Sequence, residues 1–276
     1  MTALLTRTQT KRKPAVELQG LFLPVWGPLG SAGKSTLALN LAYEFAELGK
    51  RVLLIDLDTY VPSMNQLLPI SKPTSGLSGV ARLIRQGRFS FEELDRLSIQ
   101  IIHKRNKFRL LTGLASSARW PEVTPETLQQ LIKLATLYFD VVIADLASPI
   151  EDNLVGSEHV TKRNSVARTA LQLADLALVV LSGSQSFLAR YLACVNELDE
   201  LQKTRLILVN RSEPKQSLSR ALVELTGERI FATIPNDEPS LQLAESQLLP
   251  LAVARRKSAA RNAITALAHK LLAWQP

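Results

Sequence analysis

A loop of small residues between an apolar run and a helix-like segment is the stretch of this sequence best suited to chemistry. It spans residues 27–36 and reads Gly-Pro-Leu-Gly-Ser-Ala-Gly-Lys-Ser-Thr. Such a loop turns backbone N–H groups inward, and the following helix N-terminus adds partial positive charge. We expect Lys34 to reach the β- and γ-phosphates of a nucleotide and the Ser35 hydroxyl to hold Mg²⁺. The expected nucleotide-binding residues here are Gly30, Ser31, Ala32, Gly33, Lys34, Ser35 and Thr36.

The elements around this loop support the phosphate-binding interpretation. In the strict pattern the first glycine would stand at the place of Pro28, so the spacing departs from it. Residues 21–26 predict a buried strand, and residues 37–48 predict a helix that ends at Gly49. Pro24 disfavours a central position for that strand, because proline cannot donate to the ladder. Strand, loop and helix nevertheless follow in the required order, and a glycine-rich turn without a ligand is the alternative.

Two aspartates at strand spacing end the next apolar run. Residues 51–58 read Arg-Val-Leu-Leu-Ile-Asp-Leu-Asp, which predicts the second strand of a βαβ unit. Ligands gather at the carboxyl ends of such strands, so Asp56 and Asp58 should lie beside the loop. Beside Mg²⁺ and a triphosphate, one carboxylate can act in the metal's water shell and the other can orient the attacking water. A loop-capping Asp-x-Asp is the alternative.

A third aspartate ends a later apolar run. Residues 138–145 read Tyr-Phe-Asp-Val-Val-Ile-Ala-Asp and predict another buried strand. Its terminal Asp145 suits the Walker B role of holding Mg²⁺ through a water molecule. The expected metal site therefore contains Asp145 and Ser35, with one of the two earlier aspartates.

From about residue 20 to its end the sequence resembles the ParA/MinD family of P-loop ATPases. The loop near the N-terminus, the run ending in Asp56 and Asp58, and the later Asp145 carry the resemblance. It implies that ATP and Mg²⁺ are the cofactors, that Asp58 positions the hydrolytic water and that Asp56 lies near the metal. It further implies that Asn210 recognises the base, and that Lys34 and Asp58 are the catalytic residues.

The resemblance also suggests a cellular role. Trp26-Gly-Pro, together with Leu111-Thr-Gly and Arg119-Trp-Pro, looks most like the CpaE/TadZ-like and MinD-like branches. It implies a slowly hydrolysing ATPase that acts as a positioning switch in septum-site selection, chromosome partitioning or pilus localisation. A nucleotide-binding scaffold that acts by protein contact alone is an alternative, and a metabolic kinase or amidoligase is another.

Apolar strands that alternate with helices indicate an α/β fold. We expect a predominantly parallel sheet of about seven strands with helices on both faces. The chain has 276 residues and 46% hydrophobic content, enough for a sizeable core. Residues 1–19 predict a flexible basic tail and residues 20–276 a single P-loop ATPase domain.

The charge and the cysteine content of the sequence restrict its possible binding partners and its cellular compartment. The single cysteine, Cys194, excludes an internal disulfide, and the sequence shows neither a signal peptide nor a long apolar span, so we expect a cytoplasmic protein. A net charge of +8 and a pI near 9.7 favour nonspecific contact with DNA or an anionic membrane surface, and a role in solubility alone is the alternative. Basic residues recur between residues 76 and 109, and a solvated surface is the alternative.

The C-terminal segment 255–272 predicts an amphipathic helix that covers the sheet, with peripheral membrane binding as the alternative.

Leu29 stands where the family that this sequence resembles has a lysine that crosses to the phosphates of the partner subunit. Leucine offers neither charge nor donor, so we expect a homodimer whose formation depends only weakly on ATP. Leu29→Lys should strengthen ATP-dependent dimerisation without a large change in monomer affinity. Sedimentation with and without Mg²⁺ and a nonhydrolysable ATP analogue measures this. A tight ATP-dependent wild-type dimer that survives Arg163→Ala, which removes a candidate substitute cation, would contradict the expectation.

Overall fold

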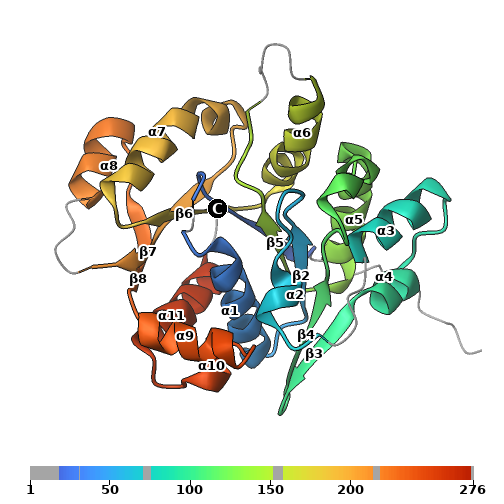
Figure 1. The fold of residues 1–276 in the computed structure, drawn as a ribbon, viewed down its shortest axis with the longest axis horizontal. Helices are drawn as coiled ribbons and strands as arrows, with labels where there is room; N and C mark the ends of the chain where they lie inside the picture. Colours follow the sequence, from blue (N-terminus) through green and yellow to red (C-terminus); the bar gives the residue numbers. More distant parts are fainter. Residues whose placement is uncertain (1–18, 31, 71–75, 152–157, 214–217, 275–276) are drawn as a thin grey trace, which may run out of the picture.

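A computed structural model describes residues 19–30, 32–70, 76–151, 158–213 and 218–274. These residues contain an eight-stranded sheet in the order β3-β4-β2-β5-β1-β6-β7-β8, parallel throughout except for the β3–β4 hairpin (Figure 1). The strands are β1 Leu21–Trp26, β2 Val52–Leu57, β3 Ile99–His103, β4 Asn106–Leu111, β5 Val141–Leu146, β6 Ala177–Ser182, β7 Arg205–Ser212 and β8 Ile230–Pro235. Residues 1–18, which hold nearly all of the predicted basic tail, lie outside the described residues.

Helices join most of the strands, and several begin at side chains that cap them. Thr124 accepts a hydrogen bond from the Thr127 N–H at 3.3 Å and Pro125 opens helix α5, as the sequence predicts. Ser258 caps the last helix in the same way, because its hydroxyl oxygen accepts a hydrogen bond from the Arg261 N–H at 3.2 Å. The helices are α1 Lys34–Glu47, α2 Met64–Leu67, α3 Gly76–Arg85, α4 Phe91–Leu97, the 3₁₀ helix η1 Ser117–Glu122, α5 Pro125–Tyr138, α6 Glu158–Leu173, α7 Gln185–Glu200, α8 Leu218–Thr226, α9 Glu238–Ser246, α10 Leu251–Ala254 and α11 Ala259–Ala273.

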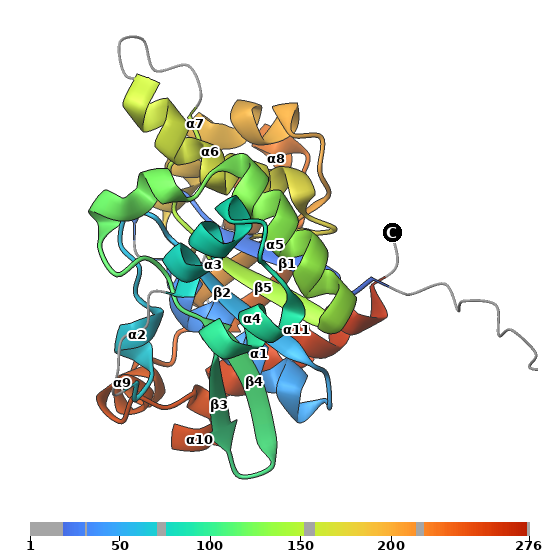
Figure 2. The ribbon, with the colours of Figure 1, turned by 90° about the vertical axis from the view of Figure 1, so that its right-hand side faces the viewer.

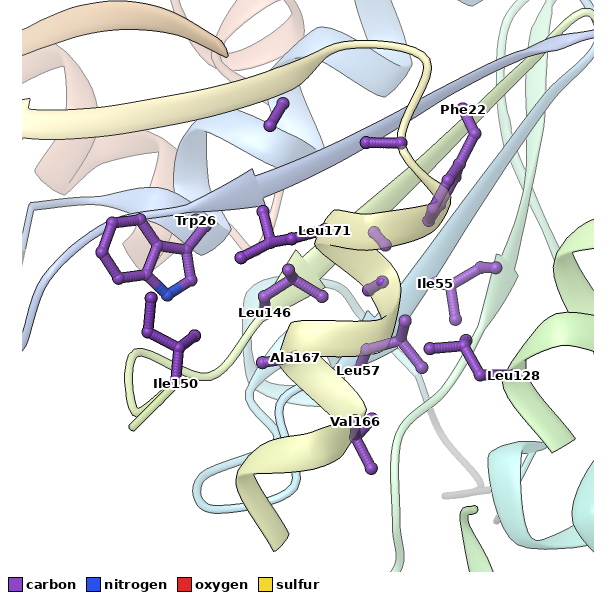
Figure 3. Close-up of a cluster of buried hydrophobic side chains, with 14 of the residues drawn as sticks. Phe22, Trp26, Ile55, Leu57, Leu128, Leu146, Ile150, Val166, Ala167 and Leu171 are labelled. Atoms are coloured by element: carbon purple, nitrogen blue, oxygen red, sulfur yellow. The ribbon is translucent and has the colours of Figure 1, made fainter. Parts of the chain in front are cut away.

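The sheet separates two buried apolar layers, as expected for a parallel sheet covered on both faces. One layer contains side chains of α3 to α8, and the other contains side chains of α1, α2 and α9 to α11. These two groups of helices lie on opposite faces of the sheet (Figures 1 and 2). Every residue of β2 and β5 is buried, which identifies them as central strands. Figure 3 shows the first layer near the end of β1, where Trp26 lies beside Ile150, with Leu146 and α6 close by.

The predicted α/β architecture is confirmed, with one strand more than expected. The additional strand, β3, lies inside the basic segment 76–109 and pairs antiparallel with β4 at the edge of the sheet. None of its residues is fully buried, so it lacks the apolar run that marks the central strands. β1 is central despite Pro24, because its ladder with β6 contains only Val25 and Trp26, which follow the proline.

The C-terminal helix covers the sheet, as the sequence predicts. Ile264, Leu267, Ala268 and Leu271 of α11 are buried in the layer that contains α1. None of the helices within the described residues has the length and apolar character needed to cross a bilayer.

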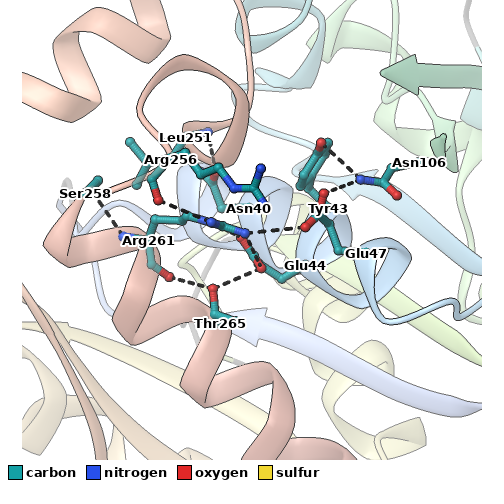
Figure 4. A network of polar contacts seen from close by, with 10 residues as sticks. All are labelled: Asn40, Tyr43, Glu44, Glu47, Asn106, Leu251, Arg256, Ser258, Arg261 and Thr265. Carbon is teal, nitrogen blue, oxygen red and sulfur yellow. Dashed lines mark hydrogen bonds and ion pairs between the residues drawn. The ribbon is translucent and has the colours of Figure 1, made fainter. Parts of the chain in front are cut away.

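A polar network fixes α11 to α1 (Figure 4). Arg261 donates from Nε to Oε1 of Glu44 at 2.9 Å, and the Thr265 hydroxyl donates to Oε2 at 2.9 Å. The Glu44 and Arg261 side chains are only 3% and 13% exposed, so the ion pair is largely shielded from water. Asn40 extends the network, because its Oδ1 accepts from the Leu251 N–H at 2.7 Å.

Removing Arg261 should therefore destabilise the fold. Arg261→Met would leave the Glu44 carboxylate buried without its cation, and we expect a loss of about 2–3 kcal/mol in the free energy of unfolding. Denaturant unfolding measures this, provided that the slope of the transition is unchanged.

The control is Arg220→Met, which breaks an exposed pair with Glu224 and should change stability by less than about 0.5 kcal/mol. Adding Glu44→Gln to Arg261→Met should recover part of the loss, since it removes the buried charge. Equal effects of the Arg261 and Arg220 substitutions would contradict the buried-pair interpretation.

Candidate functional site

The loop between β1 and α1 requires glycine at two positions. Gly33, at the N-cap of α1, has φ 78°, and Gly30 has φ 121°. A Cβ atom on Gly33 would lie 2.6 Å from Nδ2 of Asn210, and one on Gly30 would lie 2.9 Å from the Phe187 ring. The loop thus approaches both β7 and α7 too closely for a side chain. Ser31, one of the predicted binding residues, lies outside the described residues.

Two buried carboxylates lie side by side next to this loop. Asp56 on β2 and Asp145 on β5 are in register on neighbouring strands and are 1% and 0% exposed. Burial raises the pKa of Asp56 to about 7. Burial, followed by the negative charge of Asp56, raises the pKa of Asp145 to about 8. Both carboxylate oxygens of Asp145 are buried and have no hydrogen-bond partner among the described residues.

Asp56 differs from Asp145 in that its oxygens are hydrogen-bonded. It accepts from the backbone N–H groups of Asp58, Ser63 and Met64 at 3.2, 3.0 and 3.1 Å. Two of these donors open α2, so Asp56 fixes the start of that helix. The Ser63 hydroxyl also lies 3.2 Å from the Ser35 hydroxyl, which brings the start of α2 to the first turn of α1.

Lys34 opens α1 and turns its ammonium group toward the end of β5. Its Nζ donates to the Ser148 hydroxyl at 2.7 Å, and the Trp26 indole donates to the Ser148 carbonyl at 2.9 Å. Burial lowers the pKa of Lys34, while the negative charges of Asp145 and Asp58 act in the opposite direction. The lysine therefore lies among acidic groups, in a partly desolvated position suited to an anionic ligand.

Asp58 directs one carboxylate oxygen into its own turn. Its Oδ1 accepts from the Tyr60 and Val61 N–H groups, both at 2.8 Å. Asp58 also lines the cavity described below, and its second oxygen takes part in none of these turn bonds. This geometry leaves one oxygen for a ligand or a water molecule.

A cavity of about 390 Å³ is lined by many of the predicted residues, whereas Ala32, Asp56 and Asp145 are not part of its lining. Residues of the loop and of the first turn of α1 line it, together with Arg211, Ile234 and Leu241. Asn210 lines it as well, and its Nδ2 donates to the Ala32 carbonyl at 2.8 Å. Predicted residues on the cavity wall are Gly30, Gly33, Lys34, Ser35, Thr36, Asp58 and Asn210.

The structure also shows residues that the sequence did not indicate. Arg190 on α7 donates to the Leu29 carbonyl at 2.8 Å, and the Leu29 side chain is 59% exposed. Arg163, for which the sequence left open both an ordinary surface role and contact with phosphate, donates to the Thr59 carbonyl and lies over the Tyr60 ring. For Ser148 the only available signal was its place three residues beyond Asp145, while nothing in the sequence indicated Arg190.

The donor set suits Mg²⁺. Two carboxylates, Asp56 and Asp145, and the Ser35 hydroxyl provide hard oxygen donors, and Asp145 has two unpartnered oxygens that a cation would satisfy. Mg²⁺ commonly binds one or two carboxylates together with the phosphates of a ligand. In the part of the chain that the structure describes, no three His, Cys, Asp or Glu side chains gather as a metal site, so phosphate oxygens would have to complete the set.

Comparison with known families and sequences adds a further observation. Residues 25–251 match the family described as the CobQ/CobB/MinD/ParA nucleotide binding domain. A protein of Tupiella akineta that carries the name septum site-determining protein MinD is 25% identical over 214 residues. That match covers 75% of the present chain and 64% of the relative, so the chain spans less than two thirds of the relative's length.

Solved structures share the fold. The ParA family ATPase of Chlorobium tepidum TLS has a TM-score of 0.78 at 21% identity and covers 92% of this chain and 99% of its own. The cell division ATPase MinD of Pyrococcus furiosus has a TM-score of 0.72 at 19% identity, and the match covers 92% of this chain and 99% of that protein. The septum site-determining protein MinD of Pyrococcus horikoshii OT3, complexed with Mg-ADP, has a TM-score of 0.71 at 18% identity. That match covers 91% of this chain and 96% of that protein. At these identities the likeness concerns the fold.

The two buried carboxylates should make the stability of the ligand-free protein fall as the pH rises. Unfolded aspartates lose their protons near pH 4, roughly, whereas Asp56 and Asp145 keep theirs until about pH 7 and 8 when folded. Between these values the folded state binds more protons, so the free energy of unfolding decreases with pH and levels off above the higher pKa. Asp145→Asn should flatten this slope and, at about pH 8.5, stabilise the ligand-free protein by about 1–2 kcal/mol.

Thermal unfolding of both proteins without metal or nucleotide, across this pH range, is the measurement. Asp175→Asn is a matched control, because Asp175 accepts a backbone N–H bond from Phe22 at the far end of β1. Parallel curves for wild type and Asp145→Asn would contradict the prediction.

Proposed function

Because the chain belongs to the CobQ/CobB/MinD/ParA family of nucleotide-binding domains, we propose that it binds ATP with Mg²⁺ and hydrolyses it slowly as a positioning switch. The family membership confirms the resemblance inferred from the sequence. The proposed catalytic domain is residues 20–276.

The observation that carries the proposal is the meeting of three chain segments, of which the glycine-rich loop and the turn after β2 line the cavity. The glycine-rich loop, the end of β2 and the end of β5 bring Lys34 and Ser35 next to Asp56 and Asp145. Backbone N–H groups of the loop would bind the phosphates, with Lys34 leaving Ser148 to meet them. Ser35, Asp56 and Asp145 would hold Mg²⁺, whose chemistry in such a site is to offset charge on the phosphates.

Asp58 is the proposed residue for the hydrolytic water. Its Oδ1 is engaged by two backbone N–H groups, which fixes the carboxylate plane and leaves Oδ2 to orient or accept a proton from water. Asn210 is proposed to meet the adenine edge, since it lines the cavity and its amide can both donate and accept. Arg211 and Ile234 would flank the base.

The proposed cellular role is placement of a larger assembly from the cytoplasm. Two of the solved neighbours are named for cell division or septum-site determination, which supports this class of role. We propose a homodimer with weak nucleotide dependence, a protein partner, and peripheral contact with DNA or an anionic membrane surface through the net charge of +8.

Leu29 favours a second candidate function, a nucleotide-binding scaffold with little turnover. Its side chain is apolar and largely exposed at the loop, where it offers no charge to a phosphate. Such a protein would bind ATP and work by protein contact, and steady phosphate release separates the two candidates.

Nucleotide binding and turnover should respond differently to two substitutions. Mg²⁺-ATP at 100 times its Kd should add about 2.7 kcal/mol to the stability of the wild type. Lys34→Ala should abolish this gain, because the phosphates lose their buried cation. Asp58→Ala should keep it but lower kcat on the order of 100-fold, because only water activation is lost. Thermal shift and steady-state phosphate release on the same samples measure both.

The outcomes separate the possibilities. An unchanged melting curve for the wild type at millimolar nucleotide would contradict nucleotide binding. Binding without phosphate release in the wild type would favour the scaffold. Equal loss of binding and turnover in Asp58→Ala would show that Asp58 supports the metal or the fold rather than the water.

A further inference from the structure

A polar cluster outside the cavity holds the turn that contains Asp58. The Tyr60 hydroxyl donates to Oδ1 of Asn164 on α6 at 2.7 Å. The Arg163 guanidinium lies 3.9 Å from the centre of the Tyr60 ring and donates to the Thr59 carbonyl. None of Tyr60, Arg163 and Asn164 lines the nucleotide cavity, so these residues contact the turn from outside the cavity, on the side of α6.

Asn164 connects this turn to the segment that follows β5. Its side chain is 1% exposed, and its Nδ2 donates to the Glu151 carbonyl at 3.0 Å. Glu151 lies beyond Ser148, which accepts the hydrogen bond from Lys34. One buried amide therefore joins the segments after β2 and β5, and both of these border the proposed phosphate site.

The orientation of Asp58 depends on the position of residue 60. The two N–H groups that fix Oδ1 of Asp58 belong to Tyr60 and Val61, each at 2.8 Å. Val61 is 67% exposed, so its side chain has little to hold it in place. The side-chain bond from Tyr60 to Asn164, and the Arg163 contacts, are the anchors that the structure provides on the α6 side.

We propose that Tyr60 and Asn164 are positioning residues, which hold the turn after β2 so that Asp58 presents its free oxygen to the hydrolytic water. The inference rests on the proposed ATP hydrolysis. Neither residue lines the cavity proposed for the nucleotide. Their contribution is to limit the rotation of the Asp58 carboxylate, because a misplaced base loses rate although binding is unaffected.

Tyr60→Phe is the sharpest test, because it removes only the hydroxyl and keeps the ring under Arg163. We expect kcat to fall on the order of tenfold, the equivalent of one lost hydrogen bond, with the ATP Kd changed less than about twofold. Asn164→Ala should reproduce this split, and the double variant should be no slower than the slower single variant. Ser165→Ala is the control, since its hydroxyl donates to the Lys162 carbonyl of the same helix.

Testing Tyr60→Phe in a variant that lacks the Asp58 carboxylate distinguishes a positioning role of Tyr60 from a general effect on protein stability. In an Asp58→Asn background, adding Tyr60→Phe should cause no further loss of kcat, because the residue through which Tyr60 acts has already lost its function. A multiplicative loss in that background, or a loss of binding equal to the loss of turnover, would overturn the proposal.

Hydrogen exchange tests the same claim without turnover. In Tyr60→Phe the amides of residues 60 and 61 should exchange at least several-fold faster than in the wild type, while those of β5 are unchanged. Unchanged exchange at these two amides would overturn the proposal. A wild type that binds ATP but releases no phosphate, with exchange altered as expected, would instead refute the proposed hydrolysis and limit the cluster to ordering the turn.

Discussion

The burial of two carboxylates on neighbouring strands is the constraint on which this structure depends. An ionised group loses much of its hydration when it is buried, so Asp56 and Asp145 can lie side by side only with a proton or a cation between or near them. Asp56 meets three backbone N–H groups, whereas Asp145 has none among the described residues. Above about pH 8 the ligand-free fold therefore holds two unfavourably buried charges beside the phosphate loop.

Helix α1 connects this arrangement to distant parts of the chain. Its first residues face the loop, and Asn40, one turn later, binds both the Thr36 carbonyl and the Leu251 N–H at 2.7 Å. Further along, Glu44 meets Arg261, and the hydroxyl of Tyr43 accepts from Asn106 next to the β3–β4 turn at 3.2 Å. A displacement of the first turn of α1 would consequently be felt at the C-terminal helices and at the edge hairpin (Figure 4).

The sequence predicted the fold class and the segments that meet at the cavity, because apolar runs and the glycine-rich loop are local patterns. It placed Asp56 near the same metal as Asp145 only through the resemblance to the ParA/MinD family, and the structure puts these two residues in register on neighbouring strands. It missed β3, none of whose residues is fully buried. It also took Pro24 as evidence against a central strand, whereas β1 is central because its pairing with β6 begins after the proline. The Tyr60–Asn164 bond joins residues 104 positions apart, and no local pattern encodes such a contact.

Trp26 gives the protein an internal optical reporter. Its indole is fully buried among apolar side chains (Figure 3). The indole N–H donates to the carbonyl of Ser148, the residue whose hydroxyl accepts from the Lys34 ammonium. Indole emission responds to nearby charge and to the hydrogen bond of its N–H group, so movement of Lys34 away from Ser148 would change the local field at this ring. Trp120 and Trp274 lie on other elements, and replacing both with phenylalanine would leave a single fluorophore beside the phosphate loop. Site occupancy could then be followed in real time without an attached dye.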